Sequence, residues 1–288
     1  MGTLTHDQVN FFREHGYLLL ERIFDDRQVA SLCQEANWIL ELIVNSSLAN
    51  DRLSTRMDWS INSRGQLMVR KIQPINDLSL IYTRIAEDRG LLDPLEQLMH
   101  DKPVLMEEKL NYKQPLASHI DGLPVSQRDD HFPVHNDWAY YKGQNYPQNI
   151  LSSALLLDAC SADNGPLHIW PDSHQHHLEH ELLEGRLQVK RNLLDFEGGI
   201  DLIAPAGSLA IFHALLVHNS KPNFSGQPRR LMIYSHYPAS FEMPPDTRNG
   251  PFRLRESPWE RQYMRMKLAG QFTDRFTAPQ TDGANVTR

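Results

Sequence analysis

The segment "HFPVHNDWAYY" (residues 131–141) places a histidine and an aspartate two positions apart among residues that favour β-strands. In a strand, successive side chains point to opposite faces, whereas residues i and i+2 share a face. If the segment forms one strand, His135 and Asp137 lie side by side and Asn136 points away. An imidazole beside a carboxylate supplies two ligands of a metal site, so a third ligand is expected elsewhere in the chain.

The composition is that of an ordinary globular protein. The chain has 288 residues, of which 40% are hydrophobic and 23% are charged, and this length allows a sizeable core. The formal net charge of −7 disfavours nucleic acid or an anionic membrane as the main partner. Cys33 and Cys160 belong to no CxxC pair, which excludes a zinc ribbon and a disulfide framework and favours a reducing compartment.

Targeting signals are lacking in the sequence. The N-terminal residues have no apolar signal-peptide core, and no apolar run approaches the length of a membrane span. These features predict a cytoplasmic protein whose partner is a small molecule. The sequence carries no signal for a particular oligomeric state.

The spacing of apolar residues changes near Pro103. Before it, helical periodicity appears after Thr5 and again from about Asp26. After it, short apolar runs alternate with clusters of Gly, Pro, Asn and Asp. This pattern predicts a mostly β protein with flanking helices, namely a double-stranded β-helix (jelly roll) with the N-terminal helices packed on it. We expect a single domain over residues 1–270 and a disordered polar tail over 271–288.

The third metal ligand is predicted to be His218. It follows the apolar residues Leu215, Leu216 and Val217, which are typical of a buried strand. Two histidines and one carboxylate form the facial triad that holds non-haem Fe(II) and leaves coordination positions open.

The residues after His218 predict an anion site next to the metal. Ser220 is two positions on and shares its face. The segment "KPNFSGQP" (221–228) has turn chemistry, and the chain then returns as a predicted strand, which brings Arg229 beside Ser220. A guanidinium and a hydroxyl can hold the distal carboxylate of 2-oxoglutarate while its 2-oxo acid end chelates iron. Arg230 is the rival, because only one of two adjacent strand residues can point inward.

Several motifs together resemble the phytanoyl-CoA dioxygenase family, which includes ectoine hydroxylase. They are "LTHDQVNFFREHGYLLLERIF" (4–24), "HND" (135–137), "NGPLHIWPDSH" (164–174), "HNS" (218–220) and Arg229. The resemblance covers roughly residues 3 to 240 and implies a jelly-roll oxygenase that uses Fe(II), 2-oxoglutarate and O2. The usual "PGSH" turn of the family is "PDSH" here, and Asp172 tolerates such a turn better than most residues.

By position, the resemblance also assigns residues to the site. It implies that His135, Asp137 and His218 bind iron and that Ser220 and Arg229 hold the distal carboxylate. The spacing of the family motif favours Arg229 over Arg230, and Lys109 falls where family members often place a polar residue that contacts 2-oxoglutarate.

The predicted reaction couples oxidative decarboxylation of 2-oxoglutarate to hydroxylation of an unactivated C–H bond in a small polar molecule. Related halogenases have a small residue where this chain has Asp137, so the carboxylate predicts hydroxylation, with desaturation or cyclisation as the alternative. Two other classes stay open: an oxygen-independent metal isomerase or hydrolase, and a non-catalytic jelly-roll binding protein. Ser220 and Arg229 disfavour the first, and the intact triad disfavours the second.

The substrate is predicted from charges near the metal site. Glu107 is two residues from Lys109 and shares its strand face, and Asp130 lies just before the HND motif. Their negative charge favours a substrate with a cationic group, such as a nitrogen-rich natural product in secondary-metabolite tailoring. Trp138 is a further candidate for the substrate pocket. Acyl-CoA is less expected, because no basic cluster for its phosphates lies near these motifs.

Overall fold

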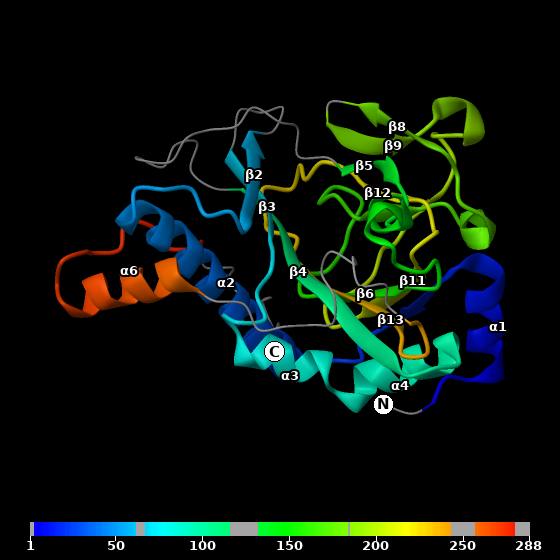
Figure 1. The fold of residues 1–288 in the computed structure, drawn as a ribbon, viewed down its shortest axis with the longest axis horizontal. Coiled ribbons are helices and arrows are strands. Elements are labelled where there is room, and N and C mark those ends of the chain that lie inside the picture. Colours follow the sequence, from blue (N-terminus) through cyan, green and yellow to red (C-terminus); the bar gives the residue numbers. More distant parts are fainter. Residues whose placement is uncertain (1–2, 62–66, 116–131, 184, 243–256, 280–288) are drawn as a thin grey trace, which may run out of the picture.

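Two antiparallel β-sheets form the frame of the protein, and helices flank the larger one (Figure 1). The computed structural model describes residues 3–61, 67–115, 132–183, 185–242 and 257–279. The two sheets provide opposite walls of one cavity, which is the arrangement of a jelly roll and confirms the predicted fold class.

The larger sheet has seven strands in the order β1-β11-β6-β13-β4-β3-β2. Because β13 lies between β6 and β4, segments far apart in the sequence are hydrogen-bonded at the centre of the sheet. The strands are β1 (Tyr17–Leu20), β2 (Met57–Ile61), β3 (Leu67–Ile72), β4 (Pro103–Pro115), β6 (Leu151–Leu156), β11 (Leu209–His213) and β13 (Leu231–Pro238).

The smaller sheet has four short strands in the order β10-β7-β12-β5, and a separate hairpin joins β8 to β9. The strands of the sheet are β5 (Phe132–His135), β7 (Leu167–Ile169), β10 (Ile200–Asp201) and β12 (His218–Ser220). The hairpin consists of β8 (His180–Leu183) and β9 (Arg186–Val189).

Helices α1 and α2 both begin at capping boxes. Thr5 and Asp25 each accept a hydrogen bond from a backbone N–H three residues on, and the glutamine there bonds back. None of the helices in the described ranges is long and apolar enough to cross a membrane. The helices are α1 (His6–His15), α2 (Asp26–Ala49), α3 (Leu80–Ala86), α4 (Arg89–Met99), α5 (Trp138–Tyr141) and α6 (Pro258–Leu268), with 3-10 turns η1 (Lys142–Gln144), η2 (Ser173–Gln175) and η3 (Arg191–Leu193).

Strand β13 separates two hydrophobic cores. Met232 and Tyr234 pack with the helices on the outer face of the larger sheet. Leu231 and Ile233 point to the other face and pack with residues of the smaller sheet. This alternation follows from the two-residue period of a strand, and it leaves the inner face available for a site between the sheets.

At the predicted "PDSH" turn, Asp172 adopts a φ of 68°, so aspartate keeps the turn that glycine makes in the family.

The C-terminal segment differs from the tail that the composition predicts. Asn45 of α2 is buried and donates from Nδ2 to the Phe276 carbonyl at 2.9 Å. Its Oδ1 accepts from the backbone N–H groups of Arg275 and Phe276 at 2.9 and 3.1 Å. These bonds hold the backbone of Arg275 and Phe276 against α2, within the segment for which the composition predicts a disordered tail. Residues 280–288 lie outside the described residues.

Replacing Asn45 by alanine should lower the free energy of unfolding by about 2–3 kcal/mol, since three hydrogen bonds of roughly 1 kcal/mol each are lost. Urea denaturation of the full chain measures this effect. The matched control is Gln34→Ala on the exposed side of the same helix, which should change stability by less than about 0.5 kcal/mol. Equal effects of the two substitutions would contradict this account of the C-terminal segment.

His236 of β13 is an unusual core residue. It is fully buried, and neither ring nitrogen has a hydrogen-bond partner among the described residues. Burial lowers the pKa of His236 to about 3, so the folded protein keeps this imidazole neutral far below its ordinary pKa.

This histidine should make the folded state less stable in mild acid. The unfolded chain takes up a proton at His236 below about pH 6.5 and the folded chain does not, so the group costs stability as pH falls from there towards its folded pKa. The loss approaches about 1.4 kcal/mol per pH unit. The His236→Leu variant keeps all the other titratable groups. Between about pH 6 and pH 4, urea denaturation should therefore show a larger loss of unfolding free energy in the wild type than in the variant. Parallel pH profiles would contradict this assignment.

Candidate active site

The pairing of β5 with β12 brings the two predicted metal-binding histidines together. His135 ends β5, and its register partner on β12 is His218. Residues directly opposite in an antiparallel pair have neighbouring side chains on the same face. The two imidazole centroids are 4.5 Å apart, and both rings are buried.

Asp137 joins the histidines by a different route from the predicted one. The sequence predicts one strand over 132–141, but β5 ends at His135 and residues 138–141 form α5. Asp137 has helical φ and ψ of −62° and −35° at the start of that helix. Asn136 Oδ1 accepts from the Ala139 N–H at 3.1 Å, and this local bond favours the helical turn over the strand that the aromatic residues favour.

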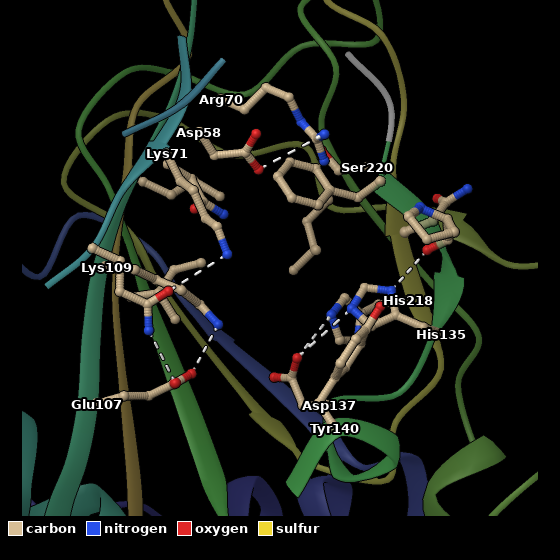
Figure 2. A pocket seen from close by; sticks show the side chains of 18 of the residues that line it. Asp58, Arg70, Lys71, Glu107, Lys109, His135, Asp137, Tyr140, His218 and Ser220 are labelled. Atoms are coloured by element: carbon tan, nitrogen blue, oxygen red, sulfur yellow. Dashed lines mark hydrogen bonds and ion pairs between the residues drawn. The ribbon is translucent and has the colours of Figure 1, made fainter. Parts of the chain in front are cut away.

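The three side chains present their ligand atoms to one point (Figure 2). Asp137 Oδ1 lies 3.7 Å from His135 Nε2 and 3.8 Å from His218 Nε2. The backbone fixes the tautomer of each ring, because each Nδ1–H donates to a carbonyl two residues earlier in the chain. These bonds are 2.7 Å for His135 to Pro133 and 3.0 Å for His218 to Leu216. Both Nε2 lone pairs are therefore available to a metal.

The protonation states suit a metal site. Burial first and His218 second lower the pKa of His135 to about 3, so its imidazole is neutral at pH 7. Burial alone raises the pKa of the Asp137 carboxyl, but the Lys109 ammonium and the two histidines outweigh it and lower this pKa overall. Two imidazoles and one carboxylate form the donor set that Fe(II) takes in oxygenases, so the residues fit the predicted metal.

A chain of hydroxyl groups holds the second oxygen of Asp137. Ser152 donates to Asp137 Oδ2 at 3.2 Å, and Ser152 Oγ lies 2.9 Å from Ser235 Oγ. The Tyr141 hydroxyl is 3.5 Å from Ser235 and donates to Glu107 at 2.6 Å. The chain orients Asp137 so that Oδ1 faces the two histidines.

Ser152→Ala should weaken metal binding about tenfold or more without unfolding the protein, because hydrogen bonds to ligands orient them. Titration with Co(II), a redox-stable substitute for Fe(II), measures the affinity. The matched control is Ser153→Ala, since Ser153 lies on the opposite face of β6 and donates to the Tyr234 carbonyl. Unchanged affinity in Ser152→Ala would rule out this role for the hydroxyl.

Arg229 lies beside Ser220, as the sequence predicts. Its Nη2 donates to Ser220 Oγ at 2.7 Å, and both residues line the cavity that contains the triad. Arg229 is 1% exposed, and its Nε and Nη1 have no hydrogen-bond partner among the described residues. Burial lowers the pKa of this guanidinium, which shows the cost of holding the charge away from water.

Arg230 points to the other side of the sheet. Its Nε and Nη2 donate to the two oxygens of Asp158 at 2.9 and 2.7 Å, and its Nη1 donates to Asn37 of α2 at 2.8 Å. The expected opposition of neighbouring side chains is confirmed, with Arg229 the residue that faces the cavity.

Glu107 and Lys109 also face the cavity, from β4. Lys109 Nζ lies 3.0 Å from Glu107 Oε1, and Glu107 further accepts from Tyr141 and from Gln73 Nε2 at 3.1 Å. Burial alone lowers the pKa of Lys109, but the Glu107 carboxylate outweighs it and raises this pKa overall. The negative charge of Glu107 is therefore already neutralised, which removes its basis as a contact for a cationic substrate.

The other two predicted substrate contacts are not part of the described cavity. Asp130 lies outside the described residues. Trp138 packs beside Tyr141 and Tyr146, and its indole N–H donates to the Tyr146 carbonyl at 3.4 Å. Its side chain is not among the described residues that line the cavity.

The cavity has a volume of ≈ 310 Å³ and includes a wall that the sequence did not indicate. Strands β2 and β3 extend the larger sheet past β4 and carry charged and polar side chains towards the triad (Figure 2). In the sequence segment "QLMVRKIQPI" (66–75), the two-residue period of a strand places Lys71 and Gln73 on one face. Nothing in the sequence, however, indicates that this strand pairs with β4. The residues missed on this wall are Asp58, Arg70, Lys71 and Gln73.

A jelly roll with two histidines and a carboxylate facing its inner cavity belongs to the class of non-haem iron oxygenases. The family model of phytanoyl-CoA dioxygenase (PhyH) matches residues 12–231, so the chain belongs to the phytanoyl-CoA dioxygenase family. The protein is thus a dioxygenase that depends on Fe(II) and 2-oxoglutarate, as the resemblance of its motifs implies.

Individual relatives are distant but cover most of the chain. An ectoine dioxygenase of Bordetella bronchiseptica is 26% identical over 81% of this chain and 75% of its own length. A probable alpha-ketoglutarate-dependent hypophosphite dioxygenase of Stutzerimonas stutzeri is 24% identical over 80% and 77%. The crystal structure of EctD from S. alaskensis with 2-oxoglutarate and 5-hydroxyectoine matches with a TM-score of 0.62 at 22% identity, over 96% of this chain and 86% of that one.

Proposed function

We propose that this dioxygenase hydroxylates an unactivated C–H bond of a small polar molecule in the cavity between the two sheets. His135, Asp137 and His218 would hold Fe(II), and Arg229 with Ser220 would hold the distal carboxylate of 2-oxoglutarate. The names of the relatives, ectoine and hypophosphite dioxygenases, support a small polar substrate. The cavity volume of ≈ 310 Å³ supports the same size class.

The observation that best supports the proposal is the burial of the Arg229 guanidinium without partners for two of its nitrogens among the described residues. A buried guanidinium whose Nε and Nη1 lack partners among the described residues costs free energy unless an anion binds it. Ser220 Oγ lies next to it and can donate to the same anion. A carboxylate that binds both groups from within the triad's cavity explains why this charge is buried there.

The residues of the chain orient and protect the reacting groups. When bound, Fe(II) supplies the oxygen chemistry, driven by conversion of 2-oxoglutarate to succinate and CO2. The Pro133 and Leu216 carbonyls accept from Nδ1–H of the two histidines and turn each Nε2 towards the metal position, and Ser152 keeps Asp137 turned to the same point. Leu231, Ile233 and Phe212 line the cavity with apolar surface and exclude water from it.

The alternatives make different use of 2-oxoglutarate and of the substrate. An oxygen-independent isomerase or hydrolase, or a binding protein without activity, would not convert 2-oxoglutarate to succinate. Desaturation or cyclisation would convert it, but the product would lose two hydrogen atoms, whereas hydroxylation adds one oxygen atom. Mass spectrometry of the product therefore separates these reactions.

The first test is the affinity for 2-oxoglutarate of the Fe(II) protein without oxygen. Chelation of iron by a 2-oxo acid should give a weak visible absorption band, and its dependence on 2-oxoglutarate concentration gives the affinity. Arg229→Met should weaken this affinity about 10- to 100-fold, because charge-assisted hydrogen bonds are lost. Fe(II) binding itself should not change.

The matched control is Arg13→Met, which removes an exposed arginine of α1 far from the triad in sequence and outside the residues that line the cavity. It should bind 2-oxoglutarate like the wild type. An unchanged affinity in Arg229→Met, or the absence of succinate formation across candidate substrates with oxygen present, would refute the proposal.

A further inference from the structure

One wall of the cavity carries an ammonium group that no described carboxylate pairs with. Lys71 lies on β3, and its Nζ points into the cavity opposite the triad (Figure 2). Lys71 Nζ donates a long hydrogen bond, of 3.5 Å, to the amide oxygen of Gln73. Lys109 on the neighbouring strand differs, because Glu107 neutralises it at 3.0 Å.

The position of Lys71 disfavours its charge in the ligand-free protein. Burial first and the nearby Lys109 ammonium second lower the pKa of Lys71. An anion bound at Nζ would offset both effects, since it replaces lost water and compensates the repulsion between the two lysines.

The remaining charges around the cavity favour an anion as well. Five of the described lining residues are cationic side chains and three are carboxylates. Bound Fe(II) adds two positive charges and 2-oxoglutarate adds two negative charges, so the loaded cavity keeps an excess of two positive charges. A concave site with such an excess attracts anionic ligands and repels cationic ones.

The sheet register gives Lys71 polar neighbours suited to an oxyanion. Its partner on β2 is Asp58, and its partner on β4 is Asn111. Cross-strand partners share a face, and both residues line the cavity. Asp58 lies 3.8 Å from Arg70, so its carboxylate already has a cationic partner. Lys71 therefore lies between this paired carboxylate and the neutral amide of Asn111. The amide group of Asn111 can donate a second hydrogen bond to an anion held by Lys71.

We infer that Lys71 anchors the substrate and that the substrate carries an oxyanion, such as a carboxylate, sulfonate or phosphonate, on the side away from the reacting carbon. This inference rests on the proposed function for the chemistry at the triad. It also reverses the cationic substrate that Glu107 and Asp130 suggest in the sequence, because Glu107 is neutralised by Lys109.

The test compares anions with neutral molecules of nearly the same shape. Protein loaded with Zn(II) and the unreactive analogue N-oxalylglycine is titrated calorimetrically with acetate and acetamide, methanesulfonate and methanesulfonamide, and methylphosphonate and its dimethyl ester. Parallel titrations use Zn(II) alone. At least one anion should bind the wild type about tenfold or more tightly than its neutral partner. Lys71→Met should abolish this preference, and Lys71→Arg should retain it.

The matched control is Lys102→Met, which removes an exposed lysine just before β4 and should keep the preference for the anion. The inference is overturned if no anion binds, if neutral partners bind equally well, or if Lys71→Met leaves the preference intact. A failure of the proposed function has a different signature. In that case N-oxalylglycine itself does not bind, while the Lys71-dependent preference persists in the titrations with Zn(II) alone.

Discussion

The antiparallel register between β5 and β12 is the constraint on which the site depends. It sets His218 directly opposite His135, and the additional pairing of β12 with β7 holds that strand from its other side. A shift of one residue would turn the imidazole of His218 to the opposite face of the sheet. The pairing of β12 with β5 shifts after His218, whereas its pairing with β7 is regular to Ser220, which also lines the cavity.

Burial determines how the charged groups of the site behave. Asp137 and Arg229 lie in the same water-poor cavity, and each would be costly there without a partner. In the proposed function, iron and a dicarboxylate together would supply those partners. Under that proposal, the desolvation cost of both charges in the ligand-free state would be offset when the cofactors bind, which favours binding of both in the same cavity.

Sequence patterns predicted the fold and the convergence of His135, Asp137 and His218. Alternation predicted only that Arg229 and Arg230 face opposite ways, and the spacing of the family motif favoured Arg229 as the one that faces the cavity. The route of the chain at Asp137 was wrong, since a side-chain bond from Asn136 favours a helical turn despite the strand propensity of the aromatic residues. The contacts of Arg275, Phe276 and Ala278 with α2 depend on two polar side chains, Asn45 and Glu41, and no sequence pattern links these to the C-terminal segment.

The charged wall of β2 and β3 was missed for a more general reason. A single strand pattern identifies residues 66–75 as extended, but it does not say which strand lies alongside. The pairing of β3 with β4 places Lys71 opposite Asn111, across 40 positions of sequence, and this long-range contact defines the cavity's second wall. The wall that we infer to anchor the substrate therefore depends on non-local pairing, whereas the predicted metal ligands fall in compact motifs.

The central claim is that His135, Asp137 and His218 bind one iron ion with Arg229 holding the far end of 2-oxoglutarate. Anomalous X-ray diffraction at the iron absorption edge, from crystals grown without oxygen with Fe(II) and 2-oxoglutarate, tests it most directly. The account predicts a single strong peak bonded to Nε2 of both histidines and to the Asp137 carboxylate, with the distal carboxylate of 2-oxoglutarate on Arg229. A peak elsewhere, or 2-oxoglutarate bound away from Arg229, would contradict it.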